Sequence, residues 1–232
     1  MPTSARGVFG IRTPLAEAFA ALLADDGVTR GLIGPREAPR IWDRHLLNCA
    51  VVTDLLRPGA DVADLGSGAG LPGVVLAIRR PDLRVTLVEP LLRRTRFLTE
   101  TVERLQLDNV EVLRARAAEL HGHREFSVVT SRAVAPLPRL LDWSMPLVAR
   151  GGWMVAMKGR SAATEVTEAA ADLARWGAGT VEVTDVGPPM IEAPTTVVRV
   201  ESTRPSQLHW RHSDREAGDL AARRSRGKGR RT

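Results

Sequence analysis

Residues 61–73 read DVADLGSGAGLPG, and this stretch constrains the fold more than any other part of the chain. A short apolar run at 62–65 is followed at once by glycines at positions 66, 68 and 70, and then by Pro72. Because glycine adopts positive φ without strain, the pattern predicts a tight turn whose N–H groups approach a ligand. A strand, a glycine turn and a helix in this order are typical of an α/β protein that binds its ligand at the turn.

The residues around the turn indicate what kind of ligand it binds. Counted from Gly66, the dinucleotide fingerprint G-x-G-x-x-G requires a glycine at position 71, where the chain has Leu71. The pattern is instead Asp64-x-Gly-x-Gly-x-Gly, which is similar to the S-adenosylmethionine (SAM) loop of class I methyltransferases. SAM is cationic at sulfur and has no phosphate, so the Asp64 carboxylate suits it and would repel a pyrophosphate. Glycine turns also connect strands to helices in many other α/β folds.

Apolar runs and helical spacing alternate along residues 59–203. We expect strands at 62–65, 85–89, 110–113, 126–130, 153–157, 180–186 and 196–201, and helices at 72–79, 92–105, 137–148 and 162–176. Repeated β–α–β units predict a Rossmann-like, mostly parallel seven-stranded sheet with helices on both faces. The last two strands have no helix between them, so they should form an antiparallel hairpin at one edge of the sheet.

We expect three regions: an N-terminal helical cap at 1–58, a SAM-binding domain at 59–203 and a basic, disordered tail at 204–232. In the cap, residues 1–13 look irregular, while 15–23 and 37–56 have helical spacing. The tail holds nine basic and three acidic residues, so it accounts for the whole net charge of +6. Such a tail suits contact with nucleic-acid phosphates, or simply keeps the protein in solution.

Composition bounds the remaining classes of protein. Hydrophobic residues make up 44% of the chain, which is enough for a core. Cys49 is the sole cysteine, so no internal disulfide forms, and no Cys/His cluster suggests a metal. No apolar run approaches the length of a membrane helix and no signal peptide is apparent, so we expect a soluble, cytoplasmic protein, and a monomer.

Three further candidate site residues lie at the carboxyl ends of expected strands, where ligands bind in open α/β sheets. Glu89 ends the second strand and is placed to bind ribose hydroxyls, although it could instead be a helix N-terminal charge. Arg132 follows the fourth strand, and Lys158 ends the fifth. Together these two cations should form a positive rim over the crevice, with the alternative that Arg132 is an ordinary surface residue.

Basic residues near the crevice are candidate RNA contacts. Arg93, Arg94 and Arg96 open the helix after Glu89, where cations oppose the helix dipole. Binding to RNA phosphate would account for them, and so would a solvated helix face. His45 lies on the second N-terminal helix, either as a buried structural histidine or as a residue that closes the site.

Missing motifs exclude several methyl acceptors. The chain has Ser-Arg-Ala-Val-Ala-Pro after the fourth strand instead of the Asp/Asn-Pro-Pro-aromatic motif of exocyclic-amine methyltransferases. Cys49 lies far from the strand ends in sequence, so the cysteine nucleophile of a pyrimidine C5 methyltransferase is missing. The acceptor should therefore be a group that attacks without covalent help.

The chain closely resembles the bacterial small-subunit ribosomal RNA guanine-N7 methyltransferases, the glucose-inhibited division protein B family. The resemblance covers roughly residues 10–202, in the family's order and spacing. It rests on residues 42–48 (WDRHLLN), 64–73, 94–98 (RTRFL), 131–133 (SRA) and 157–159 (MKG). It implies a class I methyltransferase fold, SAM as cofactor, and N7 of one guanine in 16S rRNA of the 30S subunit as acceptor.

The resemblance also implies roles for individual residues. Those implied to bind SAM are Gly66, Leu71, Ala117, Ala118 and Arg132. Together with the residues inferred from their positions, the cofactor-binding set is Asp64, Gly66, Gly68, Leu71, Glu89, Ala117, Ala118 and Arg132; the catalytic set is Arg132 and Lys158; and the RNA-binding set is His45, Arg93, Arg94 and Arg96. The alternatives are a SAM-dependent methyltransferase for another RNA site or a small molecule, and a ribosome-assembly protein that only binds RNA.

Overall fold

A seven-stranded sheet forms the centre of the molecule in a computed structural model of the chain, which describes residues 1–132, 134–187 and 194–205. The strand order is β3-β2-β1-β4-β5-β7-β6, and β1 to β5 are parallel to one another. The strands are β1 (Asp61–Leu65), β2 (Arg84–Val88), β3 (Val110–Leu113), β4 (Phe126–Arg132), β5 (Val148–Lys158), β6 (Ala178–Val186) and β7 (Thr195–Ser202).

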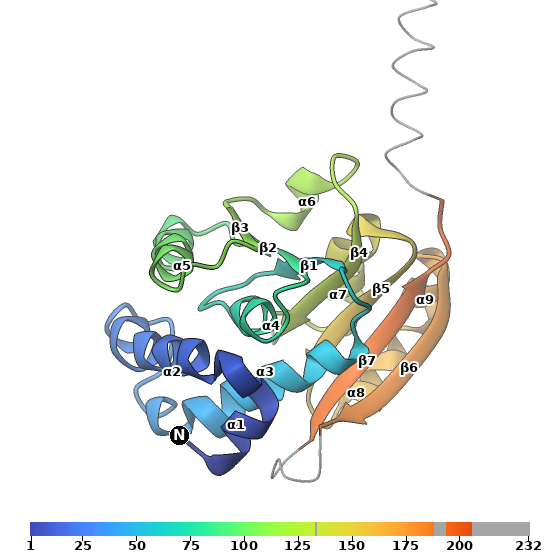
Figure 1. Cartoon of the computed structure of the whole chain (residues 1–232). Coiled ribbons are helices and arrows are strands. Elements are labelled where there is room, and N and C mark those ends of the chain that lie inside the picture. Colours follow the sequence, from blue (N-terminus) through green and yellow to red (C-terminus); the bar gives the residue numbers. More distant parts are fainter. Residues whose placement is uncertain (133, 188–193, 206–232) are drawn as a thin grey trace, which may run out of the picture.

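The predicted α/β class and the antiparallel edge hairpin are confirmed. Strand β7 lies between β5 and β6 and runs antiparallel to both, which settles the strand order at this edge (Figure 1). Strand order reverses between β1 and β4, because the chain leaves β1 toward β2 and β3 and then returns to the other side of β1. In open α/β sheets, ligands bind at the carboxyl ends of the two strands on either side of such a reversal.

The N-terminal residues are helical from Thr3 onward, in short segments of α, 3₁₀ and π geometry. These segments are α1 (Thr3–Phe9), η1 (Gly10–Arg12), α2 (Thr13–Leu22), η2 (Leu23–Gly27), η3 (Ala38–Arg40), η4 (Ile41–Leu47), α3 (Asn48–Ala50) and η5 (Val51–Leu55). The prediction that residues 1–13 are irregular is therefore wrong. Ala5 and Phe9, four residues apart, are both buried, so packing stabilises a helix whose own apolar pattern is short and interrupted by Gly7.

Helices follow β1, β2, β4 and β5 as expected, with shifted ends, whereas the short helix after β3, α6 (Ala117–Leu120), was not predicted. The others are α4 (Gly73–Arg79), α5 (Leu92–Arg104), α7 (Leu137–Ser144), η6 (Met145–Leu147), α8 (Ala162–Glu168) and α9 (Ala170–Arg175). The helix expected to reach residue 148 ends at Ser144, because Pro146 cannot donate the next helical hydrogen bond. Residues 145–147 form η6, and β5 begins directly after them at Val148, five residues earlier than predicted.

The sheet has a hydrophobic core on each face, and successive strand residues alternate between the two. Val62 and Val128 belong to the core shared with α2, α4 and α5, whereas Ala63 and Val129 belong to the core under α7, α8 and α9. Such alternation follows from the two-residue period of a strand. Parallel strands covered on both faces read as continuous apolar runs, which is how these strands appear in the sequence.

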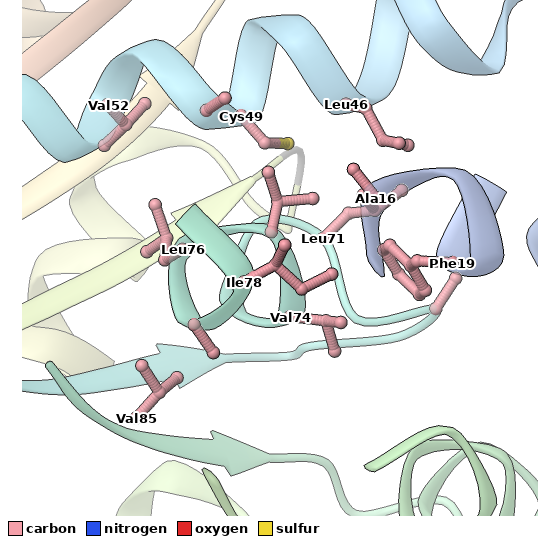
Figure 2. Close-up of a cluster of buried hydrophobic side chains, with 14 of the residues drawn as sticks. Ala16, Phe19, Leu46, Cys49, Val52, Leu71, Val74, Leu76, Ile78 and Val85 are labelled. Atoms are coloured by element: carbon pink, nitrogen blue, oxygen red, sulfur yellow. The ribbon is translucent and has the colours of Figure 1, made fainter. Parts of the chain in front are cut away.

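Helix α4 lies between the N-terminal helices and the sheet. Figure 2 shows Leu46, Cys49 and Val52 on one side of α4 and Val85 of β2 on the other. All six residues from Gly73 to Ile78 are buried. The N-terminal helices and the glycine loop are thus joined through one packed core.

The N-terminal stretch Thr3–Gly27 is long and apolar enough to cross a membrane when it is judged by length and composition alone. This differs from the expectation that no segment approaches that length. In the structure 33% of its most apolar window is buried, and Ala16, Phe19 and Leu23 contribute to the core around α4. A core helix of a soluble protein meets the same criterion.

Candidate functional site: a cavity at the carboxyl ends of β1, β2 and β4

The glycine loop turns sharply where β1 ends. Gly66, Gly68 and Gly70 have φ values of 68°, 56° and 87°, as the sequence pattern predicts. The N–H of Gly66 donates to the Val88 carbonyl at 2.8 Å, which ties the loop to β2. A Cβ on Gly66 would lie 3.2 Å from a methyl of Val134, so glycine here also allows the segment after β4 to approach closely.

The Asp64 side chain lies beneath this loop and is fully buried. Its Oδ2 accepts a hydrogen bond of 2.9 Å from the N–H of Gly73, the first residue of α4. Its Oδ1 has no hydrogen-bond partner among the described residues. Burial raises the pKa of Asp64 to about 7, and the hydrogen bond from Gly73 opposes this only in part.

Gly73 is required at this point for a steric reason that no local motif reveals. A Cβ added there would overlap the side chain of Leu87 and come within 2.7 Å of Asp64 Oδ2. Asp64 therefore joins the end of β1 to the start of α4, and this junction fixes the direction in which the helix leaves the loop.

Glu89 follows β2 directly, and its carboxylate is almost entirely buried. One oxygen accepts the Gly68 N–H at 3.0 Å, and the other accepts the Leu91 N–H at 3.0 Å. The guanidinium of Arg94 lies 3.6 Å away. The Glu89 carboxylate thus already accepts an N–H of the loop and places a negative charge there, so the loop is unsuited to a phosphate. This agrees with the absence of the dinucleotide fingerprint from the sequence.

A cavity of about 710 Å³ opens above the loop. It brings together nine of the predicted site residues: His45, Gly66, Gly68, Leu71, Glu89, Arg94, Ala117, Ala118 and Arg132. Asp64 lies directly below. The volume is within the usual range for small-molecule and cofactor sites.

Several lining residues were not expected from the sequence. Ile33 comes from the N-terminal segment, Val134 from the turn after β4 and Trp143 from α7. No local pattern marks them, because each is far in sequence from the glycine loop and reaches the cavity only through the tertiary fold. They add apolar side chains to the lining of the cavity.

Arg132 ends β4 and reaches the cavity from the side opposite Glu89. Its guanidinium contacts Nδ1 of His45, and it lies 3.5 Å from both the Arg44 carbonyl and the Cys49 sulfur. His45 Nε2 is 3.1 Å from Glu37 Oε2. Burial, together with the positive charge of Arg132, lowers the pKa of His45 to about 4 against the opposing effect of Glu37. His45 is thus a buried residue of the cavity wall.

Lys158 lies outside the cavity lining. Its Nζ donates to the Ala135 carbonyl at 2.8 Å and to Glu165 Oε2 at 2.7 Å, and its side chain is nearly buried. Glu165 also accepts the N–H of Leu137 at the start of α7. Burial alone would raise the pKa of Glu165, but the hydrogen bonds from Lys158 and Ser161 lower it. The cavity lining therefore includes Arg132 but not Lys158, although β5 runs beside β4, and the hydrogen bonds of Lys158 tie it to the turn that follows β4.

The three predicted RNA-binding arginines of α5 differ in position. Arg94 lines the cavity and is partly exposed, whereas Arg93 and Arg96 are exposed on the helix beside it. Neither Arg93 nor Arg96 forms an ion pair within the described residues, and the same holds for Arg116 at the cavity edge. No group of three or more His, Cys, Asp or Glu within the described ranges could hold a metal ion.

Comparisons with known proteins find relatives over most of the chain. The family model of rRNA small subunit methyltransferase G, GidB, matches residues 12–189. The chain is 60% identical to a protein of that name from Nocardioides sp., over 98% of this chain and 88% of the relative. It is 58% identical to one from Thermobifida fusca, over 86% and 84% of the two chains.

Solved structures with much lower identity share the fold. The S-adenosylmethionine-dependent methyltransferase SibL has a TM-score of 0.57 at 20% identity, covering 73% of this chain and 58% of SibL. TYW2 from M. jannaschii, in complex with AdoMet, has a TM-score of 0.51 at 15% identity, covering 66% and 72% of the two chains. The fold is that of class I SAM-dependent methyltransferases. With a family model matching more than half of its length and close relatives that cover most of it, the chain belongs to the rRNA small subunit methyltransferase G family.

Proposed function

We propose that the protein transfers a methyl group from SAM to N7 of a single guanine in 16S rRNA of the small ribosomal subunit. The observation that carries this proposal is the cavity at the β1/β4 reversal, bounded by the glycine loop and Glu89, in a chain of the rRNA small subunit methyltransferase G family. The protein is proposed to act in the cytoplasm as a monomer, with the small subunit as its partner.

The cavity residues fit SAM rather than a phosphorylated cofactor. The buried Glu89 carboxylate has lone pairs left to accept ribose hydroxyls, and the buried Asp64 would act from beneath by holding the loop to α4. Ala117 and Ala118 are small, which leaves room for the adenine ring at the end of β3. The rest of the SAM molecule would lie along the loop, against Gly66, Gly68 and Leu71. When bound, SAM supplies an electrophilic methyl group at a positively charged sulfur.

Guanine N7 carries a lone pair and no proton, so its attack requires no general base. The residues of the chain then act by positioning the base and by excluding water. Arg132 lies at the side of the cavity opposite the carboxylate of Glu89, where its donors can hold the carboxylate of SAM and reach the O6 edge of a guanine beside it. Leu91 and Trp143 give the cavity apolar walls. Lys158 would contribute indirectly, by holding the turn from which Val134 enters the cavity.

RNA would reach the cavity over the exposed arginines beside it. Arg93 and Arg96 on α5, together with Arg116 at the edge of α6, are free of ion pairs in the described part of the chain. Free guanidinium groups next to the opening suit the phosphates that flank an extruded guanine. Arg94 lies between this surface and Glu89, so it would contact both the RNA and the cofactor pocket.

The test is methyl transfer from radiolabelled SAM to purified 30S subunits that lack the modification, followed by nucleoside analysis. We expect label in 7-methylguanosine at one site. Arg132→Ala should reduce turnover far more than stability, whereas the matched control Arg150→Ala, an exposed residue at the amino end of β5, should leave both unchanged. SAM binding without labelled 30S subunits would direct attention to another RNA or a small molecule. Tight 30S binding without any SAM binding would indicate an assembly protein.

RNA docking is tested separately from chemistry. The double variant Arg93→Ala/Arg96→Ala should weaken 30S binding and leave SAM affinity unchanged. The slope of log K against log salt concentration should become shallower by about two, which corresponds to the loss of two phosphate contacts. An unchanged salt dependence would place the RNA elsewhere on the surface.

A further inference from the structure

The guanidinium of Arg132 is held by one turn of the N-terminal helical segment. The three groups that contact it are Nδ1 of His45, the carbonyl of Arg44 and the sulfur of Cys49. Arg44 and His45 belong to η4, the π-helical stretch Ile41–Leu47, and Cys49 follows in α3. π-Helical turns are rare and occur frequently at functional sites.

The contacts of His45 determine its tautomer. A guanidinium has only donors, so the Nδ1 atom that meets Arg132 must be an acceptor without a proton. The imidazole is then neutral with its proton on Nε2, and this N–H donates to Glu37 Oε2 at 3.1 Å. Glu37 in turn accepts a hydrogen bond of 3.0 Å from Arg44. A continuous chain of hydrogen bonds therefore runs from Glu37 through His45 to Arg132.

We propose that His45, as the neutral Nε2–H tautomer oriented by Glu37, is a positioning residue that holds the Arg132 guanidinium in the cofactor cavity. This inference rests on the proposed function in that it assigns Arg132 to the SAM site. It makes the N-terminal helices part of the binding machinery, because the residue that orients Arg132 comes from η4 while Arg132 itself comes from β4.

The charges around His45 favour the neutral form. The charged groups that face it are Glu37, Arg44 and Arg132, so a protonated imidazole would meet two guanidinium groups and one carboxylate. Its low pKa has the same cause, with burial as the larger contribution. A protonated His45 could no longer accept from Arg132, and the guanidinium would lose its principal side-chain acceptor.

The tautomer can be read directly by long-range ¹H–¹⁵N spectra of the imidazole side chains of ¹⁵N-labelled protein at neutral pH. The chain has five histidines, and the signal that disappears in His45→Asn assigns His45. In wild type we expect a neutral His45 ring protonated at Nε2. In Arg132→Ala the Nδ1 atom loses its donor, so the ¹⁵N signals of His45 should change. A ring protonated at Nδ1, or at both nitrogens, would overturn the proposal.

Three substitutions separate positioning from packing. Asn places an amide where His has Nδ1, so His45→Asn keeps an acceptor for Arg132; Gln places its amide near Nε2, and Leu has no acceptor at all. In isothermal titration with SAM, His45→Asn should stay within about threefold of wild type, while His45→Gln and His45→Leu should lose roughly tenfold or more. Equal affinities for all three variants would refute a positioning role.

A double-mutant cycle closes the test. If His45 acts through Arg132, then His45→Gln should have no further effect on SAM affinity in an Arg132→Ala background. Additive losses would mean that His45 acts independently of Arg132 and would overturn the proposal. These readouts use SAM binding and side-chain spectra, so they remain decisive even if 30S subunits are not the methyl acceptor.

Discussion

Asp64 should make the protein less stable as the pH rises from about 4 to about 7. Its carboxyl is fully buried, and burial raises its pKa to about 7, against about 3.9 for an aspartate in an unfolded chain. Between these values the folded protein holds a proton that the unfolded chain has released. Stability attributable to Asp64 is therefore greatest below about pH 4 and is lost progressively up to about pH 7. A difference of about 3 between the folded and unfolded pKa of this carboxyl corresponds to about 4 kcal/mol.

Asp64→Asn removes this ionisation while it keeps the shape of the side chain. The amide oxygen can accept the Gly73 N–H, and the NH₂ group takes the place of the unpartnered Oδ1. Burying that NH₂ costs about 1–3 kcal/mol, but this cost does not vary with pH. The free energy of unfolding of wild type minus that of the variant should thus fall by about 4 kcal/mol from about pH 4 to about pH 8.

Urea denaturation across this pH range provides the measurement. The lowered pKa of His45 contributes with the opposite sign, because stability from a histidine kept neutral rises with pH, but it is common to both proteins and cancels in the difference. Asp61→Asn, at the amino end of the same strand, is the matched control and should follow the wild-type curve. Parallel curves for wild type and Asp64→Asn would refute the reasoning, since they would mean that Asp64 is ionised equally in the folded and unfolded states.

Three other substitutions test the site. Gly73→Ala should lower the free energy of unfolding by about 2–4 kcal/mol in urea denaturation, since its methyl would overlap Leu87; wild-type stability would show that the junction can relax. Lys158→Met should lower the free energy of unfolding by about 1–3 kcal/mol, because Glu165 loses its cation. An unchanged melting temperature together with lost methyl transfer would instead make Lys158 a residue that acts on the substrate. Glu89→Gln should weaken SAM binding roughly tenfold in calorimetry, and unchanged affinity would place the ribose elsewhere.

Local sequence signals predicted most of the fold. The glycine loop, the β–α alternation and the missing helix between the last two strands each depend on residues close together in the chain, and each is confirmed. Errors arose where packing outweighed the local pattern. Helix α1 forms because Ala5 and Phe9 are buried. The end of α7 was misplaced for a different reason, because Pro146 is itself a local signal that ends a helix.

The site was predictable only in part, since packing outweighs the local pattern there too. Strand-end positions located Glu89 and Arg132 correctly at the cavity, since parallel strands end at one edge of the sheet. The environment of Lys158 was not predictable, because Glu165 lies one helix turn into the next element and its direction depends on tertiary packing. Likewise, nothing local joins His45 to Arg132, which are 87 residues apart.

The complete burial of α4 has a consequence for how the chain can be divided. The helix that leaves the glycine loop has no solvent-facing side along residues 73–78, because the N-terminal helices cover what the sheet does not (Figure 2). Deleting residues 1–58 would uncover an aliphatic surface next to the loop that holds the ligand, and would remove Glu37, Arg44 and His45 with it. N-terminal truncations, fusions and circular permutations should therefore leave the helical segments from Thr3 onward intact. A fragment that begins at β1 should aggregate.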